Sequence, residues 1–346
     1  RALDAADSES LSPIRIEAAL LEAQMARQQG RIDAASHRLA FAEAAARQQE
    51  DTPWLTEILC EGSIVAYRAG QLDVAVSRSH EGEALAAQNA PLLVACCLEV
   101  RGRSFTDRGE LQQAQRCFED ALRIYRDAGV FRGMASCQLG LGWVAMTQGA
   151  LPLAHRHIEE ARATCEEREL RMLSGVCMNM LGELERQRGQ LAESQRCYRE
   201  AVRRHQSCGA LATSMIAELN LALVHLESDE FVQARALASA VNQSIQVSGA
   251  RQFLAAVHLI LLVCAAAAER WPDWSKHFEA ARTLLDESGQ VHGDLATLAQ
   301  RAARMARDAG HSQRASAAFG LAEQQWRRLG DEPNAERAKE EEASAS

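Results

Sequence analysis

Ten cysteines are the most reactive side chains in this 346-residue sequence, and their spacing limits the chemistry that they can do. Cys97, Cys137 and Cys177 recur at intervals of forty residues, and Cys117 and Cys197 lie eighty residues apart. No Cys-x-x-Cys pair occurs, so the spacing does not match a zinc site or a redox motif. Free cysteine packs as a small apolar side chain. We therefore predict structural thiols without disulfides or metal ions, in a reducing, cytoplasmic compartment.

Other residues that could do chemistry lack the spacing for it. His155 and His157 are two positions apart, so on a helix they point to different sides and cannot share a metal ion. Gly140 and Gly142 follow no predicted strand, so they are not a dinucleotide-binding fingerprint. No phosphate-binding loop and no paired acid and base appear in the sequence. These observations predict a protein that is not an enzyme and that needs no cofactor.

Composition restricts both the fold and the partners. Aromatic residues make up 5% of the chain, and the abundance of Ala, Leu, Arg, Glu and Gln favours helices over a large sheet. The net charge of -9, without a basic block, argues against direct binding of nucleic acid. The run that comes closest to a membrane span, Leu254 to Ala268, is too short and contains His258. We expect an all-α protein that binds neither nucleic acid nor a membrane.

An internal repeat of about forty residues organises the sequence. Gly109 is followed by Leu111, Ala114, Phe118 and Ala121, at offsets of two, five, nine and twelve. Equivalent series begin at seven other origins, 39 to 41 residues apart: Gly30, Gly70, Gly149, Gly189, Asp229, Glu269 and Gly310. These offsets lie on one face of a helix, so the second helix of each unit is expected to bury this stripe against its neighbours.

Two further sets of residues repeat in step with these origins. A second turn in each unit is marked by Asn89, Gly129, Gly209, Gly249, Gly289 and Gly330, with only Glu169 breaking the row. Gly and Asn suit a helix end at which the backbone becomes left-handed. The six prolines lie where helices are expected to begin: Pro13, Pro53, Pro91, Pro152, Pro272 and Pro333. Ser12 and Thr52 precede two of them as expected N-caps.

A small residue seven positions before the origin completes the pattern, most clearly in 102–121, 142–161 and 182–201. This pattern resembles the tetratricopeptide repeat. The usual unit has about 34 residues, so the longer unit here is similar to the extended repeats in the C-terminal sensor domains of bacterial maltose-activator-like regulators and signal-transduction NTPases, and to kinesin light chain repeats. The resemblance implies a right-handed α-solenoid of about eight antiparallel helix pairs, with first helices lining a concave groove.

The predicted repeats cover residues 12–330. Their approximate limits are 12–50, 51–89, 90–129, 130–169, 170–209, 210–249, 250–289 and 290–330. We expect residues 1–11 to be the end of a preceding repeat or a linker, and residues 331–346 to form a capping helix and an acidic tail, disordered from Glu340 to Ser346. Because the chain starts at Arg1 without an initiator Met, we expect a longer protein with an effector domain (NTPase, kinase or DNA-binding) before it.

The resemblance also implies where a ligand would bind, because the family lines its groove with first-helix residues at fixed points before the turn. The matching positions are Tyr67, Arg68, Cys96, Glu99, Arg103, Asp107, Leu139, Trp143, Met146, Asn179, Glu183 and Arg186. Trp143 is the expected anchor, since an exposed inward ring can carry much binding energy, although it could instead pack against the next repeat. Arg103, Asn179 and Arg186 would hold a peptide carboxylate or backbone, or form local ion pairs on a solvated face.

The corresponding positions of repeats six and seven are apolar: Ile216, Leu219, Leu223, Leu226, Leu259 and Val263. They would bind a partner helix, form a dimer contact, or pack inside a tightly curved solenoid. The predicted function is a non-catalytic module that binds a protein or peptide segment, as the sensor or docking domain of a larger cytoplasmic bacterial regulator. The alternatives are a scaffold for self-association as a homodimer, and a domain that senses a small-molecule inducer for a transcriptional regulator.

Overall fold

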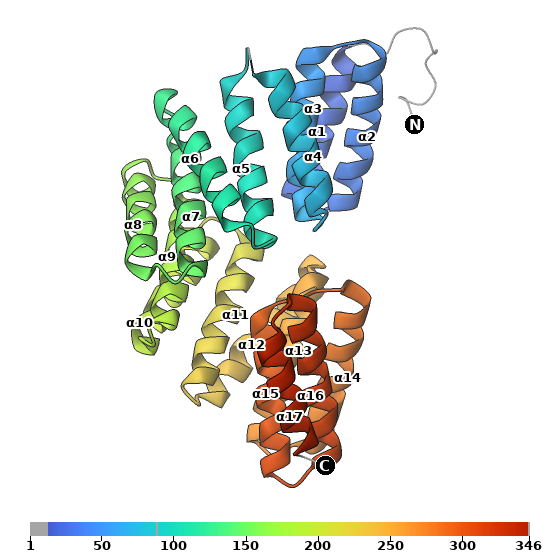
Figure 1. The fold of residues 1–346 in the computed structure, drawn as a ribbon, viewed down its shortest axis with the longest axis vertical. Coiled ribbons are helices and arrows are strands. Elements are labelled where there is room, and N and C mark those ends of the chain that lie inside the picture. Colours follow the sequence, from blue (N-terminus) through green and yellow to red (C-terminus); the bar gives the residue numbers. More distant parts are fainter. Residues whose placement is uncertain (1–12, 88, 345–346) are drawn as a thin grey trace. The chain divides into compact units, whose positions relative to one another are not determined.

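The computed structural model describes residues 13–87 and 89–344. In this part of the chain, seventeen α-helices and one short 3-10 helix, η1 (Arg251–Phe253), are joined by tight turns, and no strand occurs (Figure 1). The expected N-cap Ser12 lies outside the described residues. The all-α class and the series of helix pairs predicted from the sequence are confirmed.

Internal contacts divide the chain into two compact units, Arg1–Met180 and Leu181–Ser346, a division that the repeat pattern did not predict. The helices of the first unit are α1 (Pro13–Gln28), α2 (Ile32–Gln48), α3 (Thr52–Arg68), α4 (Leu72–Ala86), α5 (Pro91–Asp107), α6 (Leu111–Asp127), α7 (Phe131–Thr147), α8 (Leu151–Glu167) and the first part of α9 (Arg171–Gln187). From α1 to α8, each helix packs against the next, and α3 also contacts α1 and α5. The first helices of neighbouring pairs are therefore in direct contact.

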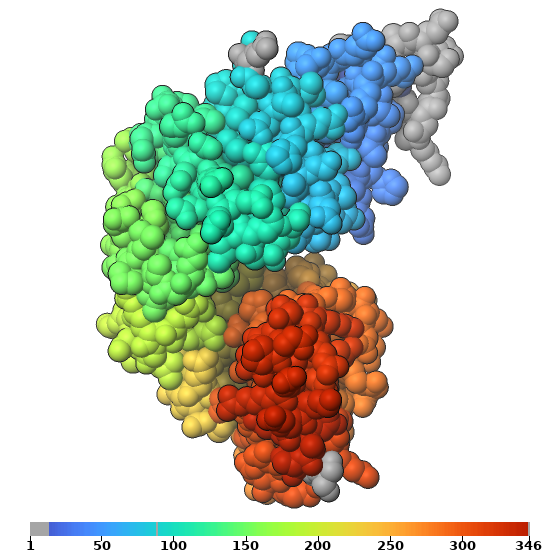
Figure 2. All heavy atoms as spheres, in the orientation of Figure 1, coloured from blue at the N-terminus to red at the C-terminus, as the bar shows by residue number. Residues whose placement is uncertain are grey.

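The second unit continues the series of helix pairs. It contains the rest of α9 and the helices α10 (Leu191–Ser207), α11 (Leu211–Glu227), α12 (Phe231–Ser248), α13 (Leu254–Ala267), α14 (Trp271–Ser288), α15 (Gly293–Asp308), α16 (Ser312–Leu329) and α17 (Glu332–Ala343). Helix α13 packs against α11, α12, α14 and α15. Within each unit, successive segments adjoin along the surface (Figure 2).

Most of the turns are tight because one residue in them adopts a left-handed backbone conformation. Gly109 has φ 76° and Gly129 has φ 67°, values at which a side chain is costly. Glu169, the one break in the predicted row, has φ 52°, so it takes the same conformation without being glycine. The turn geometry is thus imposed by the repeat even where the local residue opposes it.

The helices begin at the prolines, as predicted, but the N-cap of α3 differs from the prediction. Proline occupies the first or second position of α3, α5, α8, α14 and α17. The expected N-cap Thr52 is wrong, because Thr52 is already the first residue of α3. Asp51 is the cap instead, and its Oδ1 accepts a hydrogen bond from the backbone N–H of Trp54 at 3.2 Å. A carboxylate at this position also faces the positive end of the helix dipole.

The core of each pair consists of the stripe that the repeat predicts. Ala114, Ala121, Ala154 and Ala161 are fully buried, which lets the neighbouring helices approach closely. Eight of the ten cysteines are buried in the same way, Cys96 is half-buried and Cys208 is exposed. No helix among the described residues is long and apolar enough to cross a membrane.

The predicted disordered tail is wrong for residues 340–343, which belong to helix α17. Glu341 accepts hydrogen bonds from Arg304 Nε at 2.8 Å and from Arg304 Nη2 at 2.7 Å. These bonds attach the last turn of α17 to α15. One of the acidic residues that suggested disorder, Glu341, therefore forms an ion pair that orders the end of the chain.

Candidate functional site

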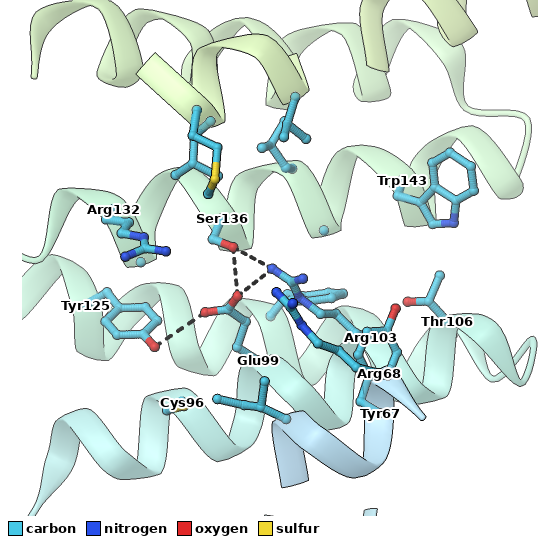
Figure 3. A pocket seen from close by; sticks show the side chains of 18 of the residues that line it. Tyr67, Arg68, Cys96, Glu99, Arg103, Thr106, Tyr125, Arg132, Ser136 and Trp143 are labelled. Carbon is cyan, nitrogen blue, oxygen red and sulfur yellow. Dashed lines mark hydrogen bonds and ion pairs between the residues drawn. The ribbon is translucent and has the colours of Figure 1, made fainter. Parts of the chain in front are cut away.

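A cavity of about 750 Å³ lies in the first unit, within the range of about 300–1,000 Å³ that is typical of ligand pockets. We call it the first-unit cavity. Its walls come mainly from the first helices α3, α5, α7 and α9, with contributions from α1 and α6 (Figure 3). Eight of the predicted groove residues line it: Tyr67, Arg68, Cys96, Glu99, Arg103, Asp107, Leu139 and Trp143.

A hydrogen-bond network on α5, α6 and α7 forms the polar centre of the cavity. Arg103 Nη2 donates to Glu99 Oε1 and to Ser136 Oγ, both at 2.7 Å. Ser136 Oγ in turn donates to Glu99 Oε1 at 2.7 Å, and the Tyr125 hydroxyl donates to Glu99 Oε2 at 3.4 Å. Figure 3 shows these contacts as one connected group. The network fixes the guanidinium of Arg103 before any ligand arrives.

Burial keeps the hydroxyl groups of the cavity protonated. Burial first, and then the negative charge of Glu99, raise the pKa of Tyr125. Burial and the charge of Asp107 raise the pKa of Tyr67 to about 12, and burial raises the pKa of Asp107 itself. Both tyrosines therefore act as hydrogen-bond donors at neutral pH. Among the described residues, no group of three or more His, Cys, Asp or Glu side chains could hold a metal ion.

Two glycines of α7 make room for the aromatic rings of α6. A Cβ at Gly133 would lie 2.5 Å from Cγ of Tyr125, and a Cβ at Gly140 would lie 2.5 Å from Cε1 of Phe118. Real Cβ atoms do not approach ring carbons so closely, so any other residue would displace the rings. Gly133 thus lets Tyr125 reach Glu99 from the second helix of its pair.

An apolar wall faces this polar centre. It contains Trp143 of α7, with 41% of its surface exposed, and Met172 of α9, with 42% exposed. Val176 and Met180, one and two turns further along α9, continue the same wall. Covering large apolar side chains that are exposed inside a cavity removes apolar surface from water and so favours ligand binding.

Four of the predicted groove residues do not line the cavity. Met146 is buried, as expected of a flexible side chain that fills gaps in packing, so its assignment to the groove is wrong. Asn179 is half-buried and also lies outside the lining. Glu183 and Arg186 belong to an ion network of the second unit. Arg186 Nη1 lies 2.9 Å from Glu227 Oε1 and 3.1 Å from Asp294 Oδ1.

The predicted apolar groove of repeats six and seven is wrong for most of its residues. Leu219, Leu226, Leu259 and Val263 are buried in the core of the second unit, and Leu223 packs against that core. The reason is that α13 is enclosed by α11, α12, α14 and α15. Ile216 alone keeps a substantial exposed surface, 39%. Apart from Ile216, these residues therefore pack inside the second unit, which is the third of the alternatives that the sequence left open.

Sequence reasoning missed several residues of the cavity. Ser136 lies seven residues before Trp143, so helical spacing alone could have placed both on one face of α7. Tyr125 comes from a second helix, whereas the family pattern points only to first helices. Arg27, from α1, lies three residues before Gly30, the position that Tyr67 holds before Gly70, so the repeat register could have found it. Arg132, from the start of α7, lies outside the positions that the pattern marks. For Tyr125 and Arg132 no local signal exists in the sequence.

Comparison with known proteins supports the repeat class. A family model described as tetratricopeptide repeat matches residues 175–207. No curated protein sequence matches the chain significantly. The solved structure of a Rap protein complexed with competence and sporulation factor is similar over 100% of this chain and 92% of that chain, with 13% identity and a TM-score of 0.73.

Two further structures are similar over most of the chain. Aspartyl phosphate phosphatase F from Bacillus subtilis has 13% identity and a TM-score of 0.63, covering 92% of this chain and 96% of that chain. NprR in complex with its cognate peptide NprX has 14% identity and a TM-score of 0.61, covering 86% and 84%. At these identities, the similarity concerns the fold alone. The fold is a series of helix pairs like that of these structures, and residues 175–207 match the tetratricopeptide repeat model, in agreement with the pattern in the sequence.

Proposed function

We propose that this chain is a non-catalytic peptide-binding module, the sensor or docking domain of a larger cytoplasmic bacterial regulator. The observation that carries the proposal is the first-unit cavity, where the network of Glu99, Arg103 and Ser136 lies opposite exposed apolar side chains. Prearranged donors and acceptors can bond to a peptide backbone, and an apolar wall can take a side chain.

Two proteins of similar fold support this choice of ligand. NprR is described in complex with its cognate peptide NprX, and a Rap protein with competence and sporulation factor. A short linear ligand also fits the volume of the cavity better than a folded domain, which would need a broad interface of about 800 Å² per partner. Peptide binding therefore accounts for the chemistry of the cavity and for its size.

The test starts from selection of random linear peptides displayed on phage against the whole chain. Selected sequences are then synthesised and titrated calorimetrically against the native protein and two variants, Trp143→Ala and the double variant Arg103→Ala/Trp143→Ala. Loss of a central aromatic anchor typically costs about 2 kcal/mol or more, so we expect at least about thirtyfold weaker binding for Trp143→Ala. The matched control is Val232→Ala, which truncates a side chain that is 72% exposed in the second unit.

Unchanged affinity in the double variant would contradict this site, and failure to select any peptide would contradict the function. The non-catalytic part of the proposal has its own test, because one similar structure is named a phosphatase. The purified chain should not accelerate hydrolysis of acetyl phosphate, a simple acyl phosphate. Hydrolysis that persists through purification and is lost in a cavity variant would contradict the non-catalytic proposal. It would show that the chain is an enzyme.

A further inference from the structure

The first-unit cavity is electropositive in a protein that is acidic as a whole. Its lining has four arginines against two carboxylates, whereas the chain carries a net charge of -9. The arginines are Arg27, Arg68, Arg103 and Arg132, and the carboxylates are Glu99 and Asp107. A local excess of positive charge in a concave site attracts anions.

Two of these arginines already have carboxylate partners inside the protein. Arg27 forms an ion pair with Glu61, and its Nη2 lies 3.5 Å from Glu61 Oε2. Arg103 is held by Glu99 and Ser136 through Nη2 alone, so its other guanidinium donors are not used in the network. These two side chains are fixed in place and neutralised in part.

The other two arginines make no hydrogen bond or ion pair with any residue in the described ranges. They are Arg68, at the end of α3, and Arg132, in the first turn of α7. Figure 3 shows Arg68 beside Arg103, and Arg132 on the other side of the Glu99–Ser136 contact, near Tyr125. The cavity therefore presents two separate cationic positions.

The surroundings of Arg68 compensate its charge only in part. Burial, followed by the positive charges of Arg27 and Arg103, lowers the pKa of Arg68 and outweighs the opposite effect of Glu61, although a guanidinium stays protonated at neutral pH. A bound anion would offset the repulsion between Arg68 and the neighbouring arginines, and this would favour its binding. A carboxylate can accept two parallel hydrogen bonds from one guanidinium, which gives direction as well as affinity.

We infer that the first-unit cavity selects an acidic peptide, in which one carboxylate pairs with Arg68, a second pairs with Arg132, and apolar side chains cover Trp143 and Met172. This inference rests on the proposed peptide-binding function and narrows it to a class of ligand. The two cationic positions set the spacing of the acidic residues in the peptide. The apolar wall requires apolar residues between or beside them.

The experiment uses the whole chain and defined probes. Pools of acetylated, amidated hexapeptides hold Glu, Gln or Lys at two varied positions, with the other positions randomised among apolar residues. Binding is measured by equilibrium dialysis with mass spectrometry and by the ligand-induced rise in melting temperature. We expect the Glu pools to bind at least about tenfold more tightly than the Gln pools, because a charged pair replaces a neutral one. Their affinity should also fall as the salt concentration is raised from about 0.05 to 0.5 M.

Two variants test whether Arg68 and Arg132 cause the preference for acidic peptides. Arg68→Gln and Arg132→Gln should each weaken the Glu pools about tenfold and leave the Gln pools unchanged. Because neither arginine forms a hydrogen bond or ion pair with the described residues, these substitutions break none, and circular dichroism should show an intact helical fold. The matched control is Arg123→Gln, on the exposed surface of α6, where the side chain is 71% exposed.

Each outcome decides a different statement. Equal binding of the Glu and Gln pools would leave peptide binding standing and overturn the acidic preference. Absence of binding by every pool would overturn the proposed function together with this inference. A last arm uses the free dicarboxylates succinate and glutarate. Binding as tight as that of the Glu pools would show that a small acid, and not a peptide, occupies the cavity.

Discussion

Gly182 of α9 lies against the ring of Tyr198 of α10, so closely that a Cβ at position 182 would be 2.8 Å from Cδ1 of the ring. The same relation joins Gly102 to Phe118, where the distance would be 3.0 Å. Tyr198 is fully buried, and its hydroxyl donates to Glu183 Oε2 at 3.0 Å. The small residue and the aromatic residue of the repeat pattern are therefore one contact pair, which explains why they recur together.

Replacing Gly182 by Ala should destabilise the second unit. Alanine favours a helix by about 1 kcal/mol relative to glycine. The methyl group would meet a buried ring that is held by a hydrogen bond, and overpacking of this kind costs about 1–3 kcal/mol. We expect a net loss of about 1–2 kcal/mol in urea unfolding followed by circular dichroism. The control is Gly320→Ala, where the added Cβ meets no atom within 4 Å and stability should rise instead. A stable Gly182→Ala variant would mean that the ring can move.

Glu169→Gly should stabilise the first unit. Glu169 has φ 52°, a conformation that costs a side-chain-bearing residue about 1–2 kcal/mol. Glycine adopts it without strain but loses more backbone entropy on folding, so the expected net gain is about 0.5–1 kcal/mol. The measurement is the urea midpoint of Glu169→Gly beside that of the reciprocal control Gly129→Ala, which should fall, since Gly129 has φ 67°. If both substitutions shift the midpoint in the same direction, turn strain is not the cause.

The repeat and part of the cavity could be predicted from the sequence because both depend on local spacing. Glu99, Arg103 and Trp143 lie on first helices at positions that the pattern marks, and all three line the cavity. Tyr125 could not be predicted, because its reach to Glu99 depends on the missing Cβ of Gly133. These two residues belong to different helices, and no pattern within one helix connects them.

Arg186 shows a different limit of the sequence pattern. It occupies a groove position by register, but its guanidinium pairs with Asp294, which lies 108 residues further along the chain. The burial of Leu259 and Val263 has a similar origin, since α13 is enclosed by helices on several sides. Register predicts which way a side chain points along its own helix. It does not predict which distant helix arrives to cover it.

Arg186→Met should destabilise the second unit strongly. The arginine contacts the carboxylates of Glu183, Glu227 and Asp294, and its side chain is 18% exposed. Burial by itself would lower the pKa of Arg186, but the surrounding carboxylates outweigh it and raise the pKa overall. Without the guanidinium, three negative charges would repel one another, and loss of one member of a largely buried ion pair costs about 3–5 kcal/mol.

Because Arg186 is not completely buried, we expect a loss of about 2–4 kcal/mol in urea unfolding at pH 7. The loss should shrink at a pH low enough to protonate the carboxylates. The control is Arg203→Met, whose side chain is 70% exposed and whose ion pair with Glu200 should contribute little, because solvent screens exposed pairs. Equal stability of the two variants would show that the network around Arg186 is not a structural element.

His277 should make the second unit less stable in mild acid. Its Nδ1 lies 3.0 Å from Nδ1 of His258, a distance at which one ring donates and the other accepts, so the two rings cannot both be protonated. Burial, and then the nearby His258 and Lys276, lower the pKa of His277 to about 4. In the unfolded chain a histidine titrates near pH 6.5. Between these values the unfolded state binds more protons, so stability is complete above about pH 6.5 and decreases as the pH falls toward 4.

The expected decrease is about 1–3 kcal/mol over this interval. It is measured as the difference between the native protein and His277→Gln in urea unfolding at pH 7, 6, 5 and 4.5, which removes the contribution of the carboxylates common to both. The native protein should lose more stability than the variant. Val232→Ala, which truncates a side chain that is 72% exposed in the second unit, is the control and should follow the pH profile of the native protein. Parallel pH profiles for the native protein and His277→Gln would mean that the histidine pair accepts protons without cost to the fold.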